Sequence, residues 1–92
     1  MCRNITPLRG LEPAATAEEI EAAARQFVRK VSGVQTVTDR IRDPFEQAVA
    51  EIAEVTTRLL AELPPRKQPP ATVPPLRRPE VRARIAARAA NG

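Results

Sequence analysis

The first clear pattern in the chain is an apolar row at helical spacing. Steps of four, three and four residues separate its members, which are Ile20, Ala24, Phe27 and Val31. Such spacing places side chains on one face of a helix. Just before the row, Thr16 and Glu19 have the spacing of a capping box, in which each side chain accepts a hydrogen bond from the other residue's backbone N–H. Gly33 favours the left-handed conformation that ends many helices, so the pattern predicts a first helix over residues 17–32.

A longer apolar stripe predicts a second helix. It is formed by Phe45, Val49, Ile52, Thr56, Leu59 and Leu63, and broadened by Ala48, Val55 and Leu60. Asp43 is the expected cap of this helix, and Pro44 suits its first position. Thr38 offers an earlier cap, but a helix from Thr38 would enclose Pro44, at a cost of about 3 kcal/mol or a kink. We therefore expect a short turn at 39–42 and a second helix over residues 44–63.

The remaining segments predict the rest of the architecture. Residues 1–15 contain Pro and Gly breakers and form an irregular segment that lies against the helices. Residues 64–79 hold seven prolines in sixteen positions, which favours a polyproline II spacer. Residues 80–92 carry strong helix formers with a narrow apolar edge, so this short helix should be marginal alone. The fold class is therefore all-α.

Within this fold class, residues 1–63 form a core that is an antiparallel helical hairpin. A Pro-rich linker over 64–79 and a basic helical tail over 80–92 follow it. We expect the tail to be physically separable, so that removal of residues 64–92 leaves the core folded.

Charge divides the chain at the same place. Residues 1–63 hold 8 Lys+Arg and 10 Asp+Glu, a net charge of −2, whereas residues 64–92 hold 7 and 1, a net charge of +6. Arginine forks onto phosphate oxygens, so the candidate nucleic-acid contacts are Arg66, Lys67, Arg77, Arg78, Arg82, Arg84 and Arg88. No aromatic residue accompanies them, so base stacking is not implied. A solvated tail that keeps the protein soluble explains the same charge.

Composition limits the core and the chemistry. Only two Phe supply aromatic bulk, and one Cys with no His excludes an internal disulfide and a His-containing zinc site. A homodimer or another protein partner is the remaining way to reinforce so thin a core. The chain has no Gly-rich loop and no convincing acid–base or nucleophile pair, so we expect no enzyme and no cofactor. It has no membrane-spanning run and no signal-peptide core, so we expect a cytoplasmic protein.

Cys2 supports an alternative hypothesis. Removal of Met1 would leave a free amine and a thiol on one residue, which together can bind a metal ion or act as a nucleophile. The cation of Arg3 would favour the thiolate. A buried small apolar side chain that anchors the segment is the simpler explanation of Cys2.

Three strings of the sequence resemble an uncharacterised bacterial family called domain of unknown function 2277. They are Met1-Cys2-Arg3-Asn4-Ile5, Glu12-Pro13-Ala14-Ala15-Thr16 and Ala24-Arg25-Gln26-Phe27-Val28-Arg29-Lys30-Val31-Ser32-Gly33, followed by Phe45. The resemblance covers residues 1–63 and implies a short helical bacterial protein with no assigned activity. Ala14 stands where the family has a second proline, and Pro44 and the tail depart from its pattern.

The polar residues inside these strings suggest a candidate ligand or thiol site. A first segment folded back beside the end of the first helix would gather Cys2, Arg3, Asn4, Arg29, Lys30 and Ser32. Helix capping and local hydrogen bonds explain the same residues equally well. We expect an interaction module, a four-helix dimer that presents its basic tail to nucleic acid or another acidic partner. The alternative is a small thiol- or metal-dependent protein that uses Cys2.

Overall fold

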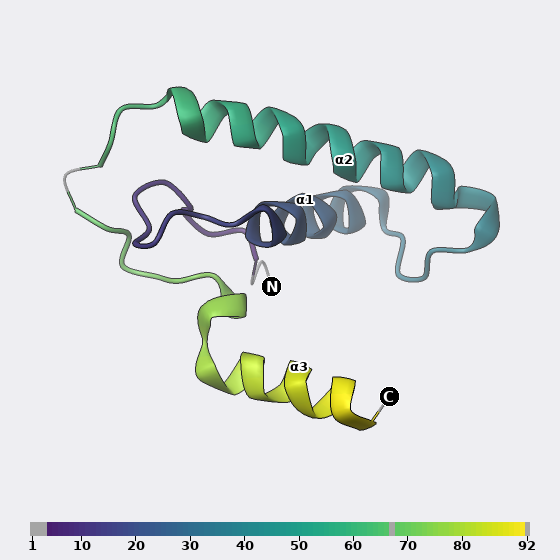
Figure 1. Ribbon diagram of the computed structural model, residues 1–92. Helices are drawn as coiled ribbons and strands as arrows, with labels where there is room; N and C mark the ends of the chain where they lie inside the picture. The colour runs from purple at the N-terminus through teal and green to yellow at the C-terminus, as the bar shows by residue number, and fades with distance from the viewer. Residues whose placement is uncertain (1–3, 67, 92) are drawn as a thin grey trace.

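The computed structural model describes residues 4–66 and 68–91, and within these ranges it is helical without a strand. Helix α1 spans Ala17–Ser32, α2 spans Asp39–Glu62 and α3 spans Pro79–Asn91. A 3-10 turn, η1, covers Pro75–Arg77. Helices α1 and α2 form an antiparallel pair, and α3 lies on the opposite side of α1 from α2 (Figure 1). The predicted all-α fold with a helical hairpin and a short final helix is confirmed.

Helix α1 begins and ends where its local signals predict. The backbone N–H of Glu19 donates to Thr16 Oγ1 over 3.1 Å, and the N–H of Thr16 donates to Glu19 Oε1 over 2.9 Å. This reciprocal pair is the capping box. At the other end, Gly33 has φ +72° and its N–H donates to the carbonyl oxygen of Arg29 over 2.9 Å.

Helix α2 begins at Asp39, so the expected turn at 39–42 and the expected start at Pro44 are wrong. Thr38 is the cap position, although its side chain makes no capping hydrogen bond. Pro44 lies inside the helix and cannot donate to the carbonyl of Arg40. Both residues are exposed, so water can satisfy that carbonyl. The helix therefore tolerates Pro44, because water replaces the hydrogen bond that its missing N–H cannot supply.

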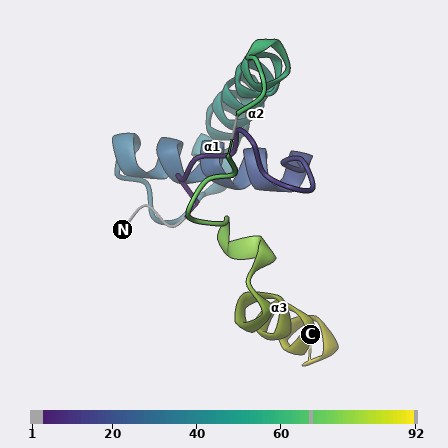
Figure 2. The same cartoon turned by 90° about the vertical axis from the view of Figure 1, so that its left-hand side faces the viewer.

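The hairpin core differs from the predicted face of α1. Ala24 and Val28 pack with Phe45 and Val49 of α2, whereas Phe27 is 46% exposed and was expected inside. Val31, expected on the same face, is also exposed. The two helices cross at an angle (Figure 2). The buried residues of α1 therefore follow the steps of four from Ile20 through Ala24 to Val28, and this row turns away from Phe27 and Val31.

The first segment completes the core, as the sequence predicts. Leu8 and Leu11 form a second buried cluster with Ile20 of α1, and Leu60 of α2 packs against it. Gly10 adopts φ +87°, and a Cβ built there would lie 2.9 Å from Cβ of Arg66. The first segment therefore fills the open end of the hairpin and meets the chain that leaves α2.

The Pro-rich segment does not stand clear of the core. Pro70, Pro74 and Pro75 are buried. The hydroxyl oxygens of Thr6 and Thr72 lie 2.6 Å apart. Residues 70–77 therefore run beside the first segment and end at η1, which contacts α3. The segment positions α3 by packing as well as by its stiffness.

Candidate functional site

An ion pair anchors the tail to the start of α1. Arg77 Nε lies 2.6 Å from Glu19 Oε2, and Arg77 Nη2 donates to Glu19 Oε1 and to the carbonyl of Ala14, each over 3.0 Å. The Glu19 side chain is only 3% exposed. Its hydrogen bonds with Arg77 hold the pKa of the Glu19 carboxyl below its usual value, against the opposing effect of burial. Arg77, one of the predicted nucleic-acid contacts, is thus occupied inside the fold.

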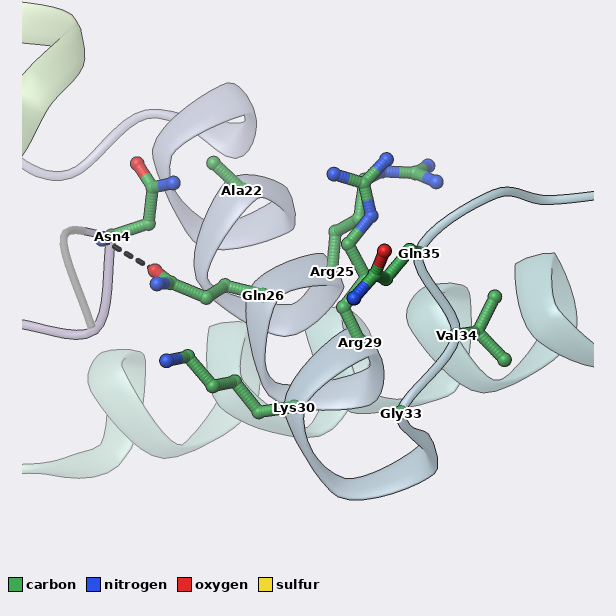
Figure 3. A pocket seen from close by; sticks show the side chains of 9 residues that line it. All are labelled: Asn4, Ala22, Arg25, Gln26, Arg29, Lys30, Gly33, Val34 and Gln35. Carbon is green, nitrogen blue, oxygen red and sulfur yellow. Dashed lines mark hydrogen bonds between the residues drawn. The ribbon is translucent and has the colours of Figure 1, made fainter. Parts of the chain in front are cut away.

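A pocket of about 620 Å³ opens along the outer side of α1 (Figure 3). It lies between the first segment and the loop that joins α1 to α2. Its lining surface is more apolar than polar, and charged and amide groups of α1 and the loop stand at its edges. The lining residues are Asn4, Ala22, Arg25, Gln26, Arg29, Lys30, Gly33, Val34 and Gln35. Among these described residues there are three cations and no carboxylate.

One of the three cations, Arg25, is held by ion pairs. Its Nη1 and Nη2 lie 2.7 Å and 2.8 Å from the two carboxylate oxygens of Glu46 on α2, and Nη2 also lies 3.1 Å from Glu21 Oε1. The guanidinium stands over the ring of Phe45, 5.8 Å from its centroid. Hydrogen bonding to Arg25 holds the pKa of Glu46 below its usual value. Arg25 therefore forms a rigid wall of the pocket and joins the two helices.

The other two cations have no such partner. Arg29 and Lys30 are exposed, and within residues 4–66 and 68–91 neither forms an ion pair. Figure 3 shows Lys30 and Gln26 extending toward Asn4, while Arg29 lies beside Arg25 and Gln35. The backbone N–H of Asn4 donates to Gln26 Oε1 over 2.6 Å, which fixes the first segment against α1.

The tail forms a second basic surface. Exposed arginines stand on α3 and just before it, at Arg78, Arg82, Arg84 and Arg88. Arg82 Nε donates to the carbonyl of Leu76 over 3.1 Å, which ties the first turn of α3 to η1. No described carboxylate forms an ion pair with these four residues. Arg66 is exposed, but its stem packs on Gly10.

Most of the chain matches a known protein family. Residues 1–84 match the model of a family described as "Uncharacterized conserved protein (DUF2277)". The chain belongs to the DUF2277 family. No curated protein and no solved structure shows a significant match.

The DUF2277 match confirms the resemblance seen in the sequence and corrects its extent. The resemblance was expected to stop at residue 63, but the match continues to residue 84. It therefore includes the Pro-rich segment, Arg77 and the first turns of α3. This extent agrees with the packing, because residues 70–77 lie against the core of this DUF2277 chain rather than outside it.

The structure brings together part of the expected ligand site. Asn4, Arg29 and Lys30 line the pocket. Ser32 does not line it, because its hydroxyl donates to the carbonyl of Val28 and accepts from the N–H of Val34. Cys2, Arg3 and Lys67 lie outside the described residues.

Sequence reasoning missed two polar residues of the pocket. Arg25 and Gln35 were not among the candidates, although the four-residue step from Arg25 to Arg29 places both on one helix face. In the described part of this DUF2277 protein, no cluster of three or more His, Cys, Asp or Glu could hold a metal ion. None of its described helices is long and apolar enough to cross a membrane.

Proposed function

We propose that this protein is a non-catalytic binding module whose helix α3 contacts nucleic acid. The observation that carries the proposal is the set of exposed arginines on and before α3, none of which forms an ion pair within the described chain. Guanidinium groups bind phosphate through paired hydrogen bonds and always carry charge.

Position favours contact with a large polyanion. Helix α3 lies on the far side of the molecule from α2 (Figures 1 and 2), so a duplex could approach it without meeting the hairpin. The one carboxylate of residues 64–92 is Glu80. It lies in the first turn of α3, where it favours the helix. The other exposed side chains of residues 81–88 are arginine and alanine, apart from Ile85.

Recognition by this helix would rest on the phosphate backbone. The chain has no Trp or Tyr, and its two Phe belong to α1 and α2, so α3 offers no platform for base stacking. Binding should therefore depend steeply on salt through release of counterions and should discriminate little between sequences.

Order of the helix is supplied by the fold. An isolated helix of 13 residues is marginal in water, but α3 follows directly on η1, which Arg77 ties to the buried Glu19. The anchor thus presents the arginines as one surface. A tail that only raised solubility would not require such an anchor.

The test is binding of fluorescent duplex DNA and duplex RNA by anisotropy over a range of salt concentrations. The variant Arg84→Ala with Arg88→Ala removes two exposed cations from α3. It should weaken binding and reduce the slope of log K against log salt by about 0.9 for each phosphate that the variant no longer neutralises. The matched control is Arg40→Ala with Arg58→Ala, which removes two exposed charges from α2. Equal weakening by both variants, or salt-independent binding, would reject the proposal.

The proposal includes self-association through α2. Val55, Leu59 and Leu63 recur at steps of four and are 55%, 51% and 37% exposed. They lie to one side of the row that packs on the core through Ile52, Ala53 and Leu60, so this side of α2 stays largely exposed within the described chain. A second copy, packed antiparallel on the same stripe, would cover it and supply the four-helix arrangement.

A further inference from the structure

We propose that the pocket along α1 is a binding site for a small phosphate monoester, separate from the nucleic-acid surface. Two cations of the pocket, Arg29 and Lys30, form no ion pair with a described carboxylate, although Glu46 lies near enough to Arg29 to attract it. They are neighbours in sequence at the last turn of α1. Arg25, in contrast, is balanced by Glu46 and Glu21 and contributes shape more than free charge.

Charge selects the class of ligand. A phosphate monoester carries about −1.5 to −2 charges near neutral pH, which matches two unpaired cations. A phosphodiester or a simple carboxylate carries one charge and would leave one cation unbalanced. The guanidinium of Arg29 offers a planar pair of donors, the ammonium of Lys30 is a mobile point charge, and the amide of Gln35 adds a neutral donor.

Shape allows an organic group beside the phosphate. A volume of about 620 Å³ is larger than a phosphate ion and falls in the range typical of small-molecule sites. Ala22 and Val34 supply apolar wall. Gly33 leaves the end of the pocket open, since nothing lies within 4 Å of a Cβ built there.

Two fixed contacts organise the walls in advance. Arg25 is held by its two bonds to Glu46, and the side chain of Gln26 is held by the N–H of Asn4. Arg29 and Lys30 therefore extend from a turn of α1 whose neighbouring side chains are already held. A rigid surround lowers the entropy lost on binding.

A simpler role for the same two cations is electrostatic. Basic residues in the last turn of a helix stabilise its carbonyl end. That role predicts an effect on stability without saturable binding of an anion, so a binding experiment separates the two explanations.

The test is a titration of the uniformly ¹⁵N-labelled full chain with phenyl phosphate, followed by amide chemical shifts. Saturable shifts in the pocket, at residues such as Ala22, Gly33 and Gln35, are expected at millimolar concentrations. The variant Arg29→Met with Lys30→Met should retain the fold and lose affinity by roughly tenfold or more, the effect of losing one charge-assisted hydrogen bond. The variant Arg84→Ala with Arg88→Ala, which also removes two charges, should bind phenyl phosphate within about twofold of the unmodified chain.

Dimethyl phosphate serves as the second ligand because it imitates the nucleic-acid backbone. It should bind the pocket more weakly than phenyl phosphate. Equal or tighter binding of dimethyl phosphate would overturn the inference and assign the pocket to the nucleic-acid surface. Absence of saturable shifts, or equal loss in both double variants, would also overturn it. Failure of α3 to bind duplexes would leave these outcomes unchanged, so the two proposals stand or fall separately.

Discussion

Arg77 donates to both carboxylate oxygens of Glu19 although 58 residues separate the two positions. The same carboxylate accepts the N–H of Thr16 in the capping box. One buried group thus closes the start of α1 and holds the tail. The cap and the tail anchor should therefore lose stability together when Glu19 is altered.

The free energy of unfolding should depend on pH through the ionisation of Glu19. Hydrogen bonds with Arg77 lower the pKa of Glu19 in the folded protein relative to about 4.3 in the unfolded chain. The stability that it contributes is therefore present above about pH 4.3 and is lost as pH falls through the folded value. Glu19→Gln should be less stable at neutral pH and lose less on acidification, as measured by urea unfolding. An identical acid profile for the variant and the unmodified chain would contradict this prediction, and Glu51→Gln, an exposed carboxylate, is the control.

Truncation should depend on where the chain is cut. A chain ending at residue 63 lacks Arg77 and the buried Pro70, Pro74 and Pro75, and leaves Glu19 without its partner. Its midpoint of thermal unfolding should fall by about 10 °C or more, the shift that ~2 kcal/mol gives in a domain of this size. A chain ending at residue 78 keeps these contacts and should melt close to the full chain. Equal midpoints for both truncations would show that the tail is separable after all.

Replacing each of the two phenylalanines by alanine should destabilise the fold by very different amounts. Phe45 is 5% exposed in the core, so Phe45→Ala should cost about 3 kcal/mol or more. Phe27 is 46% exposed, so Phe27→Ala should cost less than about 1 kcal/mol. Chemical denaturation of both variants measures the difference. A cost for Phe27 that equals that for Phe45 would place Phe27 in a buried interface.

Two glycines with positive φ should respond differently to a methyl group. At Gly33 the added Cβ meets nothing within 4 Å, so Gly33→Ala should cost about 1 kcal/mol of backbone strain. At Gly10 the added Cβ would also clash with the Arg66 stem at 2.9 Å, and the cost should rise to about 2–3 kcal/mol. Thermal unfolding of the double variant Gly10→Ala with Arg66→Gly would identify the clash. Removal of the Arg66 side chain should restore part of the stability that Gly10→Ala loses.

Self-association should depend on the exposed side of α2 that carries Val55, Leu59 and Leu63. Light scattering after gel filtration should give twice the chain mass of 10.1 kDa for the unmodified protein. Leu59→Glu places a charge in the proposed contact and should give the monomer mass, whereas Thr57→Glu, also exposed on α2, should leave the dimer intact. A monomeric unmodified chain would remove the dimer from the proposal.

The limits of helix α1 could be predicted because their causes are local. Its cap pairs residues three apart, and the hydrogen bond at Gly33 reaches back four residues. The start of α2 could not be predicted in the same way. The cost of an internal proline depends on whether the carbonyl it leaves unpaired can reach water, and only the folded chain shows that Pro44 and Arg40 are exposed.

The candidate pocket was predicted in part for a related reason. Arg29 and Lys30 belong to the last turn of the predicted first helix, and their position near Asn4 followed from the expected return of the first segment. The role of Arg25 required knowledge of Glu46, which comes from the opposite helix. The exposure of Phe27 required the crossing angle of the two helices.

By itself the sequence determined the helical class, the capped first helix, the long apolar stripe of the second and the basic character of the tail. Each of these depends on residue type and on interactions within a few positions. The tertiary structure alone decided which face of α1 is buried, that the Pro-rich segment packs on the core and that Arg77 pairs with Glu19. Such contacts join positions far apart in the chain, and their geometry depends on how the helices cross, which no local spacing encodes.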